Sequence, residues 1–115
     1  MSEKPLRDKS YLFAIRIVKL SQLLQNEHRE FVLSKQVLRS GTAIGALIRE
    51  AEFGQSKPDF TGKMSIALKE ANETEYWLSL LKDTDFIEDK MFASLQSDVK
   101  ELIAMLVSTV KTSKR

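Results

Sequence analysis

Hydrophobic residues recur at helical intervals in four stretches of this chain, so we expect four amphipathic helices. The first stretch, residues 10–26, begins at Ser10, a favourable N-cap, and ends in a polar break. The second, residues 34–53, begins at Ser34 and is followed by Gly54, which suits a helix end. The inward positions recur every three or four residues: Phe13, Ile17, Leu20 and Leu24 in the first stretch, and Val37, Gly41, Ile44, Ile48 and Ala51 in the second.

The third and fourth stretches span residues 57–82 and 86–111. A capping pair of polar residues marks the start of each of them: Ser56 with Asp59, and Asp85 with Glu88. The fourth stretch carries apolar residues in a strict heptad seam, which is typical of bundle packing. The inward positions are Phe60, Met64, Ala67, Ala71, Thr74 and Leu78 in the third stretch, and Phe92, Leu95, Val99, Leu102, Leu106 and Val110 in the fourth.

Four helices joined by short loops pack most simply as an antiparallel, up-down-up-down four-helix bundle. No linker, repeat or low-complexity segment divides the chain, so we predict one all-α domain over residues 1–115. Gly41 and Gly45 fall inside the second helix, where each costs roughly 1 kcal/mol relative to alanine. We therefore expect a neighbouring helix to approach closely at these two positions.

The composition agrees with a folded domain and excludes several classes of protein. The chain has 115 residues, of which 43% are hydrophobic and 30% charged, and only four glycines and two prolines, which disfavours an all-β fold. The absence of cysteine excludes disulfides, thiol catalysis and cysteine-based zinc sites. The first ten residues lack an apolar signal region, and no run of about 18 apolar residues occurs. We therefore expect a cytoplasmic protein.

The net charge of +2 is unevenly distributed along the chain. Residues 1–49 carry nine Lys and Arg against four Asp and Glu, whereas residues 50–115 carry nine against twelve. Such asymmetry is found in nucleic-acid-binding faces and in proteins whose halves attract each other in an assembly. Chance scatter over solvated helix faces accounts for it equally well.

The carboxylates of the segment ALKEANETEYWL, residues 67–78, raise the question of a metal or acid/base site. Di-iron sites in bundles use Glu-x-x-His motifs, but the chain has a single histidine, His28, in the predicted loop between the first two helices. Glu70 and Glu73 lie one helical turn apart, yet no nucleophile, second histidine or phosphate-binding loop accompanies them. We expect no catalytic residue, no metal ion and no cofactor.

The same two glutamates fit better as ion-pair partners of the second helix. Glu70 and Glu73 flank the inward face of the third helix, and a comparable stripe on the second helix places two alanines between two charged residues. If the stripes face each other, an interhelical ion-pair network forms, with Arg39 (or Arg49) as the cation: Arg39, Glu50, Glu70 and Glu73. Semi-buried pairs of this kind add little net stability but fix the register of packing.

Apolar residues outside the inward faces predict self-association. One group lies opposite the inward stripe of the first helix and another surrounds the single tryptophan of the third helix, and exposed patches of that size usually mark interfaces. The alternative is that Trp77 only closes the edge of the bundle. The predicted interface residues are Tyr11, Ile15, Val18, Ile66, Tyr76, Trp77 and Leu80.

Two segments of the chain, RSGTAIGALIREA (residues 39–51) and FTGKMSIALKEANETEYWLSLL (residues 60–81), resemble a known family. They are similar to the four-helix-bundle proteins of intervening sequences in bacterial 23S rRNA genes, and the resemblance extends from about Tyr11 to Val110. The chain departs from that family at Leu47, where many relatives carry a polar residue.

The resemblance implies a small up-down bundle that forms a ring-like homo-pentamer, with no assigned biochemical activity. Distant similarity to accessory proteins of diversity-generating retroelements implies basic surfaces that contact RNA. The function predicted first is a non-enzymatic oligomeric scaffold for interactions, and its favoured elaboration is the binding of RNA or DNA through a basic surface that the assembly repeats. The predicted nucleic-acid contacts are Arg16, Lys19, Arg29, Lys35, Lys111, Lys114 and Arg115.

Two other function classes remain open from the sequence. The first is a protein–protein adaptor that binds no nucleic acid, in which the basic and acidic halves serve assembly alone. The second is a carboxylate enzyme, for which replacing Glu70 and Glu73 by glutamine would leave the assembly intact. Aromatic residues are not interleaved with the basic ones in the sequence, which weighs against base stacking.

Overall fold

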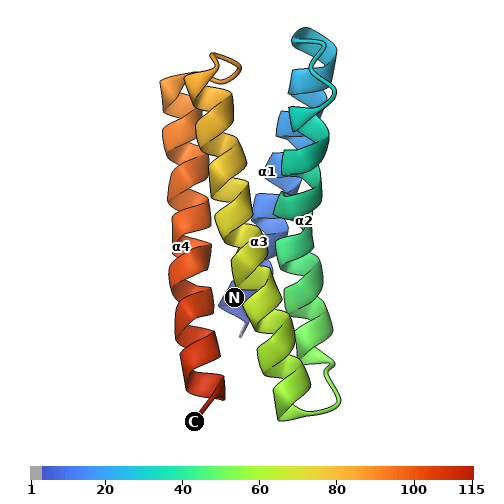
Figure 1. Cartoon of the computed structure of the whole chain (residues 1–115), viewed down its shortest axis with the longest axis vertical. Helices are drawn as coiled ribbons and strands as arrows, with labels where there is room; N and C mark the ends of the chain where they lie inside the picture. The colour runs from blue at the N-terminus through green and yellow to red at the C-terminus, as the bar shows by residue number, and fades with distance from the viewer. Residues whose placement is uncertain (1–3) are drawn as a thin grey trace.

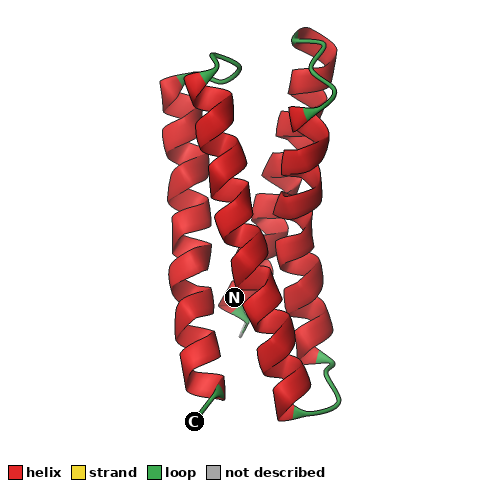
Figure 2. Cartoon of the chain, in the orientation of Figure 1, coloured by secondary structure: helices red, strands yellow, loops and turns green. Residues whose placement is uncertain are grey.

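A computed structural model describes residues 4–115 and contains four helices (Figure 1): α1 Pro5–Glu27, α2 Leu33–Glu52, α3 Lys57–Asp83 and α4 Asp89–Ser113. Consecutive helices run in opposite directions and are joined by short loops (Figure 2). No strand occurs within residues 4–115. The predicted all-α four-helix bundle is confirmed, and residues 1–3 of the predicted domain lie outside the described residues.

The predicted inward faces form the hydrophobic core of the bundle. Every predicted inward position is buried except Phe60 and Phe92, which are partly buried and pack against the core. The core also takes in Leu81 and Ile87, which the periodic pattern did not include. Since full burial of an aliphatic side chain contributes roughly 1.5–3 kcal/mol, apolar burial is the main source of stability.

The four helices do not contact one another equally. α2 packs along α1 and α3, and α3 packs along α4, whereas α1 meets α4 over a much shorter stretch. Charged side chains bridge this weaker contact: Lys9 Nζ lies 2.8 Å from Glu101 Oε1, and Arg16 Nη1 lies 2.6 Å from Asp98 Oδ2. The α2–α3 contact is therefore the central junction between the two helical hairpins.

Two predicted N-caps in the first half of the chain lie elsewhere in the structure. α1 begins five residues before Ser10, with Pro5 in its first turn, where proline fits well. Ser10 is buried inside the helix, and its hydroxyl donates to the Arg7 carbonyl at 3.0 Å. α2 begins at Leu33 rather than at the predicted Ser34, whose backbone N–H donates to the carboxylate of Glu30 at 2.8 Å.

The predicted capping pairs of α3 and α4 differ in outcome. The Ser56 pair is confirmed, because the backbone N–H of Asp59 donates to Ser56 Oγ at 3.2 Å. The Asp85–Glu88 pair is wrong: α4 starts three residues later than predicted, and its N-cap Glu88 makes no side-chain cap hydrogen bond. Asp85 has a φ of 67°, a left-handed conformation that a helix start does not accommodate.

Both interior glycines of α2 face α1 at short range, as the sequence predicts. A Cβ atom at Gly41 would lie 2.8 Å from Ile17 Cγ2, closer than packed atoms tolerate. A Cβ atom at Gly45 would lie 3.4 Å from the Ser10 carbonyl oxygen. The absence of a side chain at Gly41 therefore lets α1 and α2 pack closely, whereas a Cβ atom at Gly45 would make an ordinary contact.

We expect Gly41→Ala to destabilise the protein, because the added methyl group must displace the fully buried Ile17 side chain. Overpacking of this kind costs about 1–3 kcal/mol, which exceeds the helix-propensity gain of alanine. Gly62→Ala is the matched control, because nothing lies within 4 Å of its added Cβ, and it should stabilise α3 by roughly 0.5–1 kcal/mol. Urea unfolding of both variants measures the difference, and equal effects would contradict the packing argument.

Candidate functional site at the α2–α3 junction and the adjoining groove

A charged cluster joins α2 to α3 at the centre of the bundle. Arg39 of α2 places its guanidinium between two carboxylates of α3, with Nη1 donating to Glu70 Oε2 at 2.7 Å and Nη2 donating to Glu73 Oε2. Glu70 is only 7% exposed, whereas the side chain of Arg39 is half exposed. The arginine therefore neutralises one nearly buried carboxylate and one that is partly open to solvent.

Further hydrogen bonds extend this cluster on both sides. The indole N–H of Trp77 donates to Glu73 Oε2 at 3.2 Å. On the buried side, Thr74 Oγ1 lies 2.8 Å from the Glu70 carbonyl oxygen and 2.9 Å from Ser40 Oγ. Since the threonine hydroxyl carries one proton, it donates to the carbonyl and accepts from the Ser40 hydroxyl. The α2–α3 junction thus carries polar contacts from the core to the surface.

The arrangement favours a structural role for these carboxylates over acid/base chemistry. The hydrogen bond from Arg39 to Glu70 raises the pKa of the guanidinium, with the negative charges of both glutamates adding to the effect. Within the described part of the chain, no group of three His, Asp or Glu side chains is arranged to hold a metal ion. Among residues 4–115, the carboxylate groups of Glu70 and Glu73 accept hydrogen bonds from Arg39 and Trp77, and neither of these side chains is a nucleophile.

One member of the predicted network, Glu50, lies elsewhere. It is eleven residues beyond Arg39 along α2, which corresponds to roughly 16 Å of helix, and it lines a groove together with Lys63. Arg49, the alternative cation, lies over the Tyr11 ring at 5.8 Å and takes no part in the cluster. The periodic pattern placed Glu50 on the same stripe as Arg39 but could not show that Glu50 lies near Lys63 of α3, away from Glu70 and Glu73.

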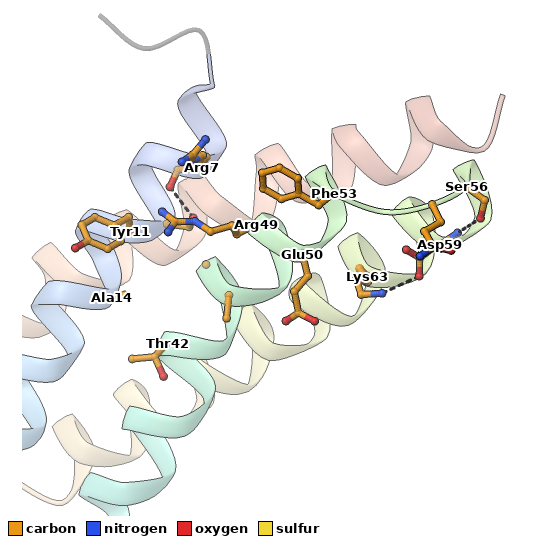
Figure 3. Close-up of a pocket in the computed structure, with 14 residues that line it drawn as sticks. Arg7, Tyr11, Ala14, Thr42, Arg49, Glu50, Phe53, Ser56, Asp59 and Lys63 are labelled. Atoms are coloured by element: carbon orange, nitrogen blue, oxygen red, sulfur yellow. Dashed lines mark hydrogen bonds and ion pairs between the residues drawn. The ribbon is translucent and has the colours of Figure 1, made fainter.

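The groove that contains Glu50 has a volume of about 1100 Å³. It lies between the first half of α1, the second half of α2 and the start of α3 (Figure 3). Small side chains such as Ala14 and Ala46 line it, and Gly45 leaves further room. Tyr11 and Phe53 stand at its edge, with exposed fractions of 56% and 75%.

The charged groups of the groove include one ion pair that shifts two pKa values. Lys63 Nζ lies 2.7 Å from Asp59 Oδ1. This hydrogen bond lowers the pKa of Asp59 below its usual value and raises the pKa of Lys63, which Glu50 raises further. Arg49 has no carboxylate within ion-pair distance among residues 4–115, so its cation faces the groove uncompensated.

A second pocket of about 610 Å³ lies between the first turns of α1 and the second half of α4. Apolar side chains dominate its lining, among them Leu6, Phe60 and Met105. Glu52 lies at this pocket and pairs with Lys4 at 2.9 Å. The pocket contains no constellation of polar groups that would suggest chemistry.

The predicted interface residues occupy two separate regions of the surface. Ile15 and Val18 of α1 are each 38% exposed, and Ile66 and Tyr76 of α3 are 49% and 60% exposed. Trp77 is partly buried and packs against the core, and its ring contacts Tyr76 edge to face. The remaining two predicted residues are Tyr11, at the edge of the groove, and Leu80, which is partly buried.

The predicted nucleic-acid contacts do not form one continuous surface. Arg29 and Lys35 flank the α1–α2 turn, whereas the C-terminal cluster is at the opposite end of the bundle (Figure 1). Arg16 is partly neutralised by Asp98. The remaining predicted contacts are exposed: Lys19 on α1, and Lys111, Lys114 and Arg115 at the C-terminus.

Sequence reasoning missed the groove because its members are far apart in the chain. Tyr11, Arg49 and Phe53 come from α1, the last turn of α2 and the residue after it. The signal available was Gly45, which marks the point where α1 and α2 approach and their neighbouring side chains gather. Glu75, which had no predicted role, points towards α4, where Lys100 Nζ lies 4.0 Å from its carboxylate.

The fold and the site define a small four-helix-bundle protein whose central helix pair is held by an arginine–dicarboxylate cluster. The chain belongs to the family of 23S rRNA-intervening sequence proteins, whose model matches residues 5–108. A crystal structure of a protein of unknown function from the S23 ribosomal protein family of Bacteroides thetaiotaomicron is similar, with 56% sequence identity and a TM-score of 0.91. The match covers 92% of this chain and 98% of that one. No curated protein matches the chain.

None of the helices within residues 4–115 combines the length and apolar character that a membrane crossing requires. The family match and the structural relative carry no enzymatic assignment.

We expect a coupling energy of about 1 kcal/mol between Arg39 and Glu70, measured by a double-mutant cycle with Arg39→Met and Glu70→Gln. Glu70 is nearly buried, so removing its cation leaves a poorly solvated charge. The control cycle uses Lys9→Met and Glu101→Gln, a pair with both partners exposed, whose coupling should be below about 0.5 kcal/mol. Equal coupling in the two cycles would show that burial of Glu70 has no consequence.

The Asp59–Lys63 pair predicts a pH-dependent contribution to stability. Since its folded-state pKa is lowered, Asp59 stabilises the fold above its unfolded pKa of about 3.9, and this contribution disappears as the pH falls through the lowered value. Asp59→Asn should therefore lower the melting temperature at pH 7 but not near pH 2. Circular dichroism melts at both pH values test this, and a constant difference between wild type and variant would refute it.

Proposed function

We propose that this protein is a non-enzymatic subunit that self-associates into a homo-oligomer and acts as an interaction scaffold. The observation that carries the proposal is the pair of exposed apolar faces on different helical hairpins. The α1 face contains Ile15 and Val18, and the α3 face contains Ile66 and Tyr76. Exposed apolar patches on a soluble protein are a common mark of contacts with another protein surface.

The two faces differ in composition, which favours a contact between unlike surfaces of neighbouring subunits. Such heterologous contacts generate closed rings when the rotation between subunits closes. The hairpin that carries the α1 face has an excess of basic residues, and the hairpin that carries the α3 face has an excess of acidic ones. Opposite charges therefore support docking of one face on the other, and the family resemblance favours five subunits.

RNA or DNA is the partner that we propose for the assembled scaffold. Lys19, Arg29 and Lys35 are exposed, and no carboxylate in the described range lies within ion-pair distance of them. A ring would present these cations several times, so that weak contacts with phosphates add through multivalency. A protein–protein adaptor without nucleic acid is the alternative, and retention on RNA at low salt distinguishes the two.

Light scattering of the wild-type protein should give a mass that is a multiple of the 13.1 kDa subunit. Ile15→Lys and Ile66→Lys should each shift the mass towards the monomer, because a lysine placed within an apolar contact must be desolvated. Met91→Lys is the control, since Met91 is an exposed apolar residue of α4 outside both faces. A monomeric wild-type protein at micromolar concentration would overturn the assembly proposal.

A further inference from the structure

The groove between α1, α2 and the start of α3 combines features that no sequence segment combines. Arg49 lies with its guanidinium 5.8 Å from the Tyr11 ring centre. Phe53 is three-quarters exposed and stands on the same side of the groove as Arg49 (Figure 3). The fold therefore interleaves two open aromatic rings with an uncompensated cation, the combination that the linear sequence lacks.

We propose that this groove binds a nucleotide unit, with its base against Tyr11 or Phe53 and its phosphate at Arg49. The inference rests on the proposed function in one respect, because it supplies a base-contacting site for the nucleic acid that the scaffold would bind. Stacking on aromatic rings is tolerant of base identity, and an arginine beside the ring adds both stacking and charge. A volume of about 1100 Å³ accommodates a ligand of nucleotide size.

The remaining polar groups of the groove suit a nucleotide better than an apolar helix. Glu50 and Asp59 offer carboxylate oxygens, which accept hydrogen bonds from the exocyclic amino groups of bases. Lys63 forms an ion pair with Asp59, which partly neutralises its charge, so Arg49 remains the main phosphate contact. An apolar helix docked in the groove would cover these charged groups without providing partners for them.

The groove geometry also favours single-stranded over duplex nucleic acid. Bases in a duplex are stacked on one another and their faces are inaccessible to side chains, whereas unpaired bases can splay out onto aromatic rings. The same chemistry recognises a free nucleotide, so the two sources are separated by experiment. Binding of single-stranded oligonucleotides depends on backbone charge as well, whereas a mononucleotide depends on the groove alone.

The test measures fluorescence polarisation of the full-length protein with a labelled single-stranded RNA decamer, the matching duplex, and a labelled adenosine monophosphate. Phe53→Ala and Arg49→Gln should each weaken single-strand binding at least about fivefold, in line with the contribution of one stacked base. Lys90→Gln removes the same charge as Arg49→Gln at an exposed site of α4 outside both the groove and the predicted nucleic-acid contacts, so it should weaken binding less than about twofold. Light scattering of each variant verifies that the assembly is unchanged.

Each outcome decides a separate point. Weaker decamer binding in the groove variants alone supports the nucleotide site in the groove. Binding of the mononucleotide without binding of the decamer also supports the groove site, with a free nucleotide as its ligand, and refutes RNA or DNA as the partner of the scaffold. Duplex binding as tight as single-strand binding would overturn the stacking site. Decamer binding that Lys90→Gln and the groove variants weaken equally would overturn the groove and leave the scaffold proposal standing. Absence of all binding at low salt would overturn both the groove site and the proposal that RNA or DNA is the partner.

Discussion

The arginine–dicarboxylate cluster at the α2–α3 junction is the constraint on which the rest of the structure depends. α2 and α3 are the only neighbours that link the two hairpins over a long stretch within the described residues, because α1 meets α4 only briefly. Apolar burial supplies most of the stability, but apolar side chains alone allow α3 to slip along α2 from one register of packing to another. The contact of Arg39 with two carboxylates, one of them nearly buried, is satisfied in a single register.

That register places the other surface features relative to one another. The groove takes its walls from α1 and α2 and its end from the first turns of α3, so it exists only when α2 and α3 are correctly aligned. The exposed faces proposed for assembly lie on α1 and α3, and their separation is set by the same alignment. A helix pair fixed by charge thus holds two candidate contact surfaces in a defined geometry.

The sequence was sufficient for the fold because each helix carries an unambiguous inward stripe, and the bundle buries these stripes as predicted. It also identified Arg39, Glu70 and Glu73 as neighbours, since their spacing matches across two adjacent helices. The helix starts were less predictable, because several serines suited capping and Ser10 and Ser34 are buried instead. The groove could not be predicted, since it depends on the height at which α1 meets α2 and on the turn that follows Phe53.

The central claim, that the Arg39 cluster sets the α2–α3 register, is tested most directly by electron-spin distance measurements. The chain has no cysteine, so spin labels at two introduced cysteines, replacing the exposed residues Lys35 of α2 and Lys69 of α3, report on one distance alone within each subunit. Diluting labelled with unlabelled subunits removes distances between copies. The account predicts a narrow distribution in the otherwise wild-type chain and a broadened one in Arg39→Met, with a second population shifted by up to the rise of one helical turn, ~5.4 Å. Identical narrow distributions in the two proteins would contradict it.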